Sequence, residues 1–154
     1  MKKLSIALLL CFVSYLSNSQ DLHFRSGKEK NQDKPLLFAK EASRFSVRPE
    51  FINQMLSGRT QQQVTVQVSP KTTFNGKVTA ITHDAPGLET IIMHSSEVPG
   101  LVLSISRLEI PGKGTTYSGV MISRDHRDLL MMEKDPVTGQ YLWNKKEVSS
   151  MILD

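Results

Sequence analysis

Residues 100 to 123 read Gly-Leu-Val-Leu-Ser-Ile-Ser-Arg-Leu-Glu-Ile, then Pro-Gly-Lys-Gly, then Thr-Thr-Tyr-Ser-Gly-Val-Met-Ile-Ser, and this stretch decides the fold class. Leu101, Leu103 and Ile105 alternate with smaller or polar residues, which is the period of a half-buried strand. Pro111 to Gly114 is a four-residue turn signal, and a second strand-like run follows it. The stretch therefore predicts two strands joined by a turn.

The same pattern fills the chain from Gln63 onward. Turn signals recur every ten or so residues, and all five prolines after Gln63 fall in them, because proline cannot donate to a central ladder. The runs between the turns predict strands at 63–68, 74–83, 89–97, 101–110, 115–123, 128–134 and 140–144. Short strands at this spacing predict a mostly β fold, either an antiparallel sandwich or a partly open barrel of about six or seven strands over 63–144.

Two irregularities are expected in these strands. In the first strand quoted above the apolar phase slips by one residue, which predicts a β-bulge near Ser106-Arg107. Gly76 and Gly119 lie inside strand-like runs and mark further bulges or a close approach of another backbone. Asn75-Gly76 is alternatively a tight hairpin turn that divides strand 74–83, but the alternation across it favours the long strand.

The amino end has the three parts of a secretory signal peptide. A positive start is followed by an apolar run from Leu4 to Leu16 and by small residues before a cleavage point after Ser19. We favour this interpretation over a buried N-terminal helix, and it predicts a secreted or periplasmic product that begins at Gln20. Cys11, the single cysteine, lies inside the apolar run, so a free product without disulfides is expected rather than a membrane-anchored one.

Three parts are therefore predicted: a signal peptide at 1–19, a mobile segment with short helices at 20–62, and an antiparallel β domain at 63–154. The leader takes Lys2 and Lys3 with it, which halves the formal net charge of +4. So small a surplus, without a basic run that contains aromatic residues, argues against a nucleic-acid partner.

One or two short helices are predicted before the sheet. The first has Asp33 as N-cap and Pro35 in its first turn, and its apolar stripe is made by Phe38, Ala42 and Phe45. The second runs from Pro49 to a stop at Gly58, with an apolar side made by Phe51, Ile52, Met55 and Leu56. Helices this short need a surface to pack on, either the sheet or another protein.

The carboxyl end is apolar, with Val148, Met151 and Ile152 at helical spacing. Because most chain ends are polar and loose, this segment is expected to pack down, or the natural chain continues beyond it.

No residue is assigned a catalytic, cofactor-binding or metal-binding role. The chain contains no His-Glu-x-x-His, Gly-x-Ser-x-Gly or glycine-rich phosphate-loop motif. The best candidates for a general base are the turns His83-Asp84 and Asp125-His126-Arg127-Asp128. Because neighbours on a loop seldom point at each other, solvated turns are the favoured interpretation.

The other conspicuous side chains have structural interpretations. His94 is predicted to be a half-buried strand residue and His23 lies in the mobile segment, while no ligand spacing supports a metal on His83, His94 and His126. The methionines favour core filling over a flexible partner patch; they are Met121, Met131 and Met132. The aromatic pair of the last strand favours a closing cluster of the sheet over an exposed patch; it is Tyr141 and Trp143.

The sheet also shares strand and turn positions with a known family. They are Phe74-Asn-Gly-Lys-Val, Pro99-Gly100-Leu101 with Leu103, Ser106-Arg107, Tyr117-Ser-Gly119, Ile122-Ser-Arg124, Asp128-Leu, and Tyr141 with Lys145-Lys146. Across residues 60–154 the chain resembles the β-rich amino-terminal pro-region of large secreted zinc metalloproteases of the Bacteroidetes. The resemblance implies a pro-domain-like module, from a larger precursor or existing by itself, and it carries over no catalytic residue.

Three functions are compatible with these features, in the following order. The first is a secreted non-enzymatic module, pro-domain-like or protease-interacting, whose partner is a metalloprotease in its own downstream sequence or in a separate chain. In that case Asp21 or Asp33 on the mobile lead is the candidate to shield the zinc ion. The second is a binding module whose sheet holds a small apolar ligand or a glycan. The third is a small hydrolase with a His-Asp pair from the turns. No cofactor is expected, and the chain is not expected to be an enzyme unless it belongs to a longer protease precursor.

Overall fold

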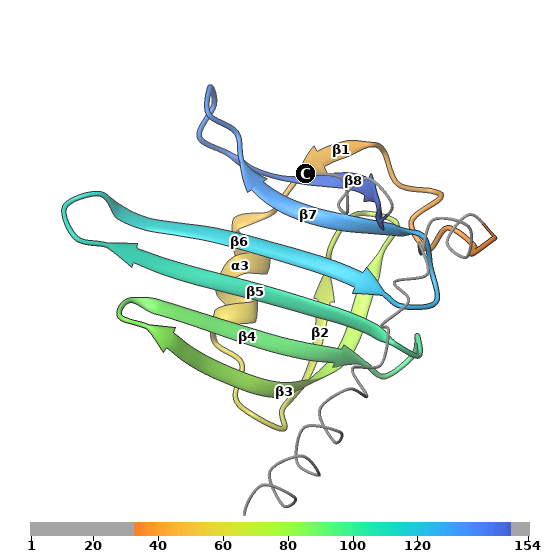
Figure 1. Ribbon diagram of the computed structural model, residues 1–154, viewed down its shortest axis with the longest axis horizontal. Coiled ribbons are helices and arrows are strands. Elements are labelled where there is room, and N and C mark those ends of the chain that lie inside the picture. Colours follow the sequence, from red (N-terminus) through yellow and green to blue (C-terminus); the bar gives the residue numbers. More distant parts are fainter. Residues whose placement is uncertain (1–32, 149–154) are drawn as a thin grey trace, which may run out of the picture.

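A computed structural model describes residues 33–148, which form one curled antiparallel sheet with a short helix against its inner face (Figure 1). The order of the strands is β1-β8-β7-β6-β5-β4-β3-β2. The strands are β1 (Arg44–Ser46), β2 (Gln63–Gln67), β3 (Thr73–Ala85), β4 (Leu88–Ser95), β5 (Leu101–Ile110), β6 (Gly114–Ser123), β7 (Asp128–Lys134) and β8 (Tyr141–Glu147). The mostly β fold is confirmed, and the sheet is the partly open barrel rather than the sandwich.

All seven predicted strands are present, and β1 is an eighth that the sequence did not indicate. β1 pairs with β8 through Phe45 and Trp143. From β2 to β8, each strand pairs with the next one in the chain, so the sheet is a succession of hairpins.

The second predicted helix is confirmed as α3 (Pro49–Leu56). Pro49 occupies the first turn, where its missing N–H has no intrahelical acceptor to lose. The side of α3 that faces the sheet is buried as the apolar pattern predicted, with Phe51, Ile52 and Met55 in the core.

The first predicted helix is wrong, because the segment before β1 forms turns and bends. The Asp128 carboxylate accepts the N–H groups of Leu37 at 2.7 Å and Phe38 at 2.9 Å. Lys145 Nζ donates to the Glu41 carbonyl at 2.8 Å. Groups on the sheet therefore satisfy backbone atoms that a helix would have paired within itself.

The bulge predicted near Ser106-Arg107 is also wrong, since β5 pairs with β6 from Leu101 to Ile110 without a register shift. The residues after the slip, Leu108 and Ile110, instead have the strand parity of the outer face. They lie near the tip of the β5–β6 hairpin and are half-buried and exposed, respectively, so the core needs no change of phase there.

Register shifts occur in β3, between Val78 and Ala80 and between Thr82 and Ala85. The first one makes Thr79 an extra residue, so the alternation predicted to include Ala80 ends at Val78. Ile81 then pairs with the buried Ile91 and packs against the core.

The long strand across Asn75-Gly76 is confirmed, and both interior glycines are places of close approach. A Cβ atom on Gly76 would lie 2.6 Å from the His94 carbonyl oxygen, and one on Gly119 would lie 2.6 Å from Ile105 Cδ1. At Gly76 the obstacle is backbone, so the position has no room for a side chain, whereas at Gly119 the Ile105 side chain would have to shift.

The core lies between the inner face of the sheet and α3. The ring of Trp143 is fully buried and meets Phe51 edge-on, with 5.7 Å between ring centroids. The predicted closing cluster on β8 is therefore confirmed, with Tyr141 packed against its margin. Met121 and Met132 fill the core as expected, while Met131 is half-buried and has the opposite strand parity.

Candidate functional site

The described part of the chain has a pocket between α3 and the β7–β8 hairpin. Its volume is about 580 Å³, which falls within the usual range for small-molecule sites. The residues that line it come from the end of β1, the β1–α3 link, α3, β6 and the β7–β8 turn with the start of β8. They are Ser46, Val47, Arg48, Pro49, Ile52, Asn53, Tyr117, Gly139, Gln140 and Tyr141.

The wall next to α3 is fixed by the way the chain enters the helix. The Val47 N–H donates to the Tyr141 carbonyl at 2.8 Å, which carries the β1–β8 pairing one residue beyond β1. Pro49 then starts the helix at once. Val47 and Ile52 are buried, whereas Arg48 is exposed at the rim.

The opposite wall is a pair of tyrosines. The rings of Tyr117 and Tyr141 meet edge-on, with 5.5 Å between centroids. The Tyr141 hydroxyl accepts the Tyr117 N–H at 3.0 Å and lies 3.3 Å from the Thr116 hydroxyl. A side chain from β8 thus bonds to β6 where β7 has left it, because β6 and β7 pair only over Gly119–Ile122.

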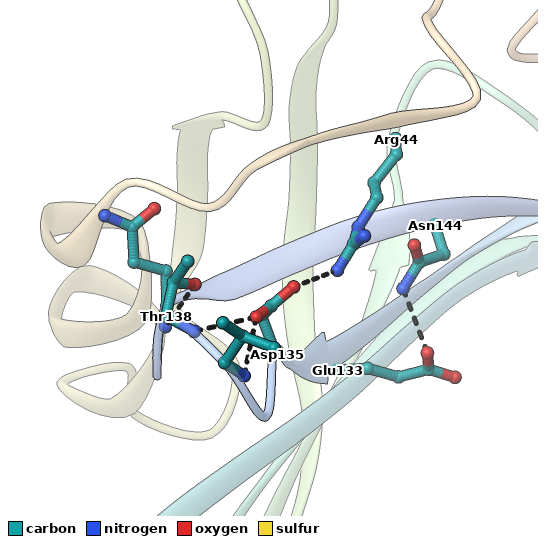
Figure 2. A network of polar contacts seen from close by, with 7 residues as sticks. Arg44, Glu133, Asp135, Thr138 and Asn144 are labelled. Carbon is teal, nitrogen blue, oxygen red and sulfur yellow. Dashed lines mark hydrogen bonds and ion pairs between the residues drawn. The ribbon is translucent and has the colours of Figure 1, made fainter.

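The rim at the β7–β8 turn is organised by Asp135, as Figure 2 shows. Its Oδ1 atom accepts the N–H groups of Val137 at 2.9 Å and Thr138 at 2.8 Å, while its other oxygen binds the Arg44 guanidinium. The Thr138 N–H and then the Val137 N–H are the main causes that lower the pKa of Asp135 below its ordinary value of 3.8. This turn places Gly139 and Gln140 at the pocket.

The lowered pKa predicts an acid-sensitive turn. Stability from the ionised Asp135 is fully present above pH 3.8 and is lost as the pH falls through the lower folded-state pKa. Asp135→Asn keeps an acceptor for the turn but has no charge to lose. We therefore expect the melting temperature of the wild type to fall more steeply than that of the variant below pH 4. Thermal melts from pH 6 to pH 2 check this, and a constant difference between the two proteins over that range would contradict it.

A second hollow, of about 510 Å³, lies beside the β3–β4 turn and contains a charged cluster. Arg107 Nη2 lies 3.0 Å from Glu89 Oε2, and its Nε lies 3.8 Å from Glu109 Oε1. His83 Nε2 lies 3.6 Å from Glu89 Oε1, while Asp84 accepts the Thr82 hydroxyl. The structure thus places His83 beside a carboxylate across the hairpin and not beside its neighbour in sequence.

The other candidate for a general base was His126, in a turn for which a solvated position was the favoured interpretation; its ring is half-buried and lies against Ser123. His126 Nδ1 is 2.9 Å from Ser123 Oγ, Asp125 lies 3.6 Å from Arg124, and Asp128 binds the backbone groups described above.

Of the remaining candidates, His94 and Asp33 are among the described residues, and neither lines the pocket. His94 is on β4 as predicted but is exposed rather than half-buried. Asp33 is exposed at the start of the described segment, and His23 and Asp21 lie outside the described residues. Within residues 33–148, no group of three or more His, Cys, Asp or Glu side chains could hold a metal ion.

Comparison of the chain with protein-family models, curated proteins and solved structures finds no match. In the described segment, none of the helices has the length and apolar character needed to span a membrane.

Sequence reasoning found Tyr141 but missed its partner Tyr117 and the α3 wall. A signal for Tyr117 was present, since it shares strand parity with the apolar Met121 and so belongs to the inner face. The link between Tyr117 and Tyr141 depends on the register of three strands, which the alternation within one strand does not determine.

Proposed function

We propose that this chain is a secreted, non-enzymatic binding module that holds a small, largely apolar ligand between α3 and the β7–β8 hairpin. The pocket itself is the observation that carries the proposal. Its walls are made by aliphatic side chains on one side and two tyrosine rings on the other, and its volume suits a ligand of drug size. Such a surface binds by removing apolar area from water.

The polar groups at the pocket are few, and they favour a ligand with one acceptor group. Arg48 is exposed at the rim, and its Nη1 atom lies 3.5 Å from Gln67 Oε1, which leaves most of its donors to the solvent. Asn53 and Gln140 add neutral donors and acceptors. An apolar carboxylic acid matches this set better than a glycan, which needs polar partners along its whole length.

A thermal-shift screen tests the proposal. Medium-chain fatty acids and aromatic carboxylic acids are compared with neutral oligosaccharides. A ligand at a hundred times its Kd is expected to raise the melting temperature by about 5 to 10 °C. Gln140→Trp narrows the pocket and should abolish the shift, whereas Lys113→Trp on the distant β5–β6 turn should retain it.

Two results would overturn the proposal. The first is a wild-type melting temperature that no acid in the panel changes. The second is an equal shift in Gln140→Trp and Lys113→Trp, which would place the binding outside the pocket.

The pro-domain-like, protease-interacting module is the second candidate. The observation that favours it is the stretch 114–118 of β6, which pairs with β5 on one side and with none of the described strands on the other. Such an edge offers a surface to a protein partner. If an excess of the chain from Gln20 leaves the activity of a secreted zinc metalloprotease unchanged, this candidate loses its support.

A further inference from the structure

We propose that residues 114–118 of β6 bind an extended, acidic segment of a partner protein as an added strand. This site borders the pocket, because Tyr117 and Tyr141 belong to both, but the segment pairs with the backbone edge of β6 and not with the pocket walls. The first observation is a break in the strand pairing. β6 pairs with β5 over its whole length but with β7 only over Gly119–Ile122, so within the described residues 33–148 no strand lies on the other side of residues 114–118. In Figure 1 the β7–β8 hairpin turns away from the β5–β6 hairpin at this place.

The direction of the backbone groups follows from one hydrogen bond. The Tyr117 N–H donates to the Tyr141 hydroxyl, so it points away from β5. In an antiparallel ladder the N–H and C=O of one residue point to the same side, and the residue two positions away repeats that direction. The exposed Thr115 therefore presents its N–H and C=O to the open side as well.

This edge differs from the edge of the sheet at β2. There α3 covers the strand, and Gln54 Nε2 donates to the Thr65 carbonyl at 2.8 Å. On β6 the Tyr117 N–H is bound by the Tyr141 hydroxyl. A carbonyl oxygen of an incoming strand can replace this hydroxyl as the acceptor. An extended polypeptide repeats its donors and acceptors at the same two-residue period as the edge, which makes it the matching occupant.

Charge favours an acidic segment. Lys113 directly precedes the open stretch and is exposed. Lys134, at the end of β7, is exposed, and its Nζ atom lies 6.0 Å from the centre of the Tyr141 ring, whose hydroxyl binds the Tyr117 N–H. The nearest acid of β7, Glu133, is already paired with Lys146 at 2.8 Å. Two lysines at the opening attract carboxylates on the partner.

The test uses a fluorescein-labelled octapeptide of alternating threonine and glutamate, with binding followed by anisotropy. Thr115→Pro removes a donor from the open side, where proline is tolerated, and should weaken binding about tenfold. Thr115→Val keeps that donor and is the matched control, with a change below about twofold. Tyr141→Phe removes the competing hydroxyl and should tighten binding.

Two further probes keep the test decisive if Thr115→Pro does not fold. The same peptide methylated on every amide nitrogen lacks the donors of a strand and should not bind. A threonine–lysine octapeptide should bind more weakly than the acidic one, with the difference shrinking at high salt.

Three outcomes of the peptide-binding measurements would overturn the proposal. They are no binding of the acidic peptide to the wild type or to Tyr141→Phe, equal binding by the Thr115→Pro and Thr115→Val proteins, and undiminished binding of the methylated peptide. Dimerisation of Tyr141→Phe without peptide would likewise overturn it, because the occupant would then be a second copy of this chain.

Discussion

Trp143→Ala is expected to lower the free energy of unfolding by about 3 to 5 kcal/mol. Trp143 is fully buried, contacts Phe51 of α3 edge-on and lies opposite Phe45 of β1. Removal of the indole leaves a cavity where α3, β1 and the rest of the sheet meet. The surrounding side chains cannot fill this cavity without leaving their own positions. Since the free energy of unfolding of a small domain is only about 5 to 15 kcal/mol, the variant should be partly unfolded at moderate temperature.

Two milder substitutions make the result specific. Trp143 Nε1 is a buried donor that has no hydrogen-bond acceptor among the described residues, so Trp143→Phe removes this unsatisfied group together with part of the ring. Its loss should be smaller, about 1 to 2 kcal/mol. Leu142 is the neighbouring residue, is half-buried and has the opposite strand parity, so Leu142→Ala should lower the free energy of unfolding least of the three. Urea denaturation gives the free energy of unfolding of the three variants. If Trp143→Ala lowered it no more than Leu142→Ala does, this account of the core would be contradicted.

Asp128→Ala is expected to have the second-largest effect, a loss of about 2 to 4 kcal/mol. The carboxylate is 1% exposed and accepts two backbone N–H groups of the segment before β1, at Leu37 and Phe38. Alanine leaves both donors without this partner, one on the buried Phe38 and one on the half-buried Leu37. The segment must then detach or bear that penalty.

The control for Asp128 is another aspartate of the same turn. Asp125 has a side chain that is 56% exposed and lies 3.6 Å from Arg124. Asp125→Ala should change stability by no more than about 0.5 kcal/mol. Asp128→Asn should fall between the two, because an amide keeps one acceptor but turns its NH₂ group toward another donor. Equal losses for the two alanine variants, measured by urea denaturation, would refute the role of Asp128.

The sequence was sufficient for features that depend on neighbours in the chain. Period-two alternation and turn residues predicted the strands from Gln63 onward, and Pro49 with its apolar face predicted α3. The first helix failed because its backbone groups are satisfied by Asp128 and Lys145, about a hundred residues away, and local propensity holds no information about such partners. The wrong prediction of a bulge has a similar cause. A slip in the apolar alternation looks the same in the sequence when the backbone bulges and when a regular hairpin extends past the core.

The candidate site was still harder to predict. The histidine-carboxylate pairs drew attention by their chemistry, yet His83 and His126 lie away from the pocket, beside Glu89 and Ser123. The pocket is instead formed by ordinary residues, such as Ile52 and Tyr117, that only the register brings together. Sequence reasoning can find the inner face of a sheet, but a hollow in that face depends on where two strands separate.

The succession of hairpins has a consequence for the order of folding. From β2 to β8 every strand can join the one just made, so only short loops need to close. The segment from residue 33 to the end of β1 is different, because its partners lie far along the chain. β1 pairs with β8, and the Leu37 N–H donates to Asp128, which is 91 residues away. We therefore expect this segment to dock after the rate-limiting barrier of folding has been crossed. The stability lost in Asp128→Ala should appear as faster unfolding with an almost unchanged folding rate. The contacts of this segment would then determine how long the protein stays folded.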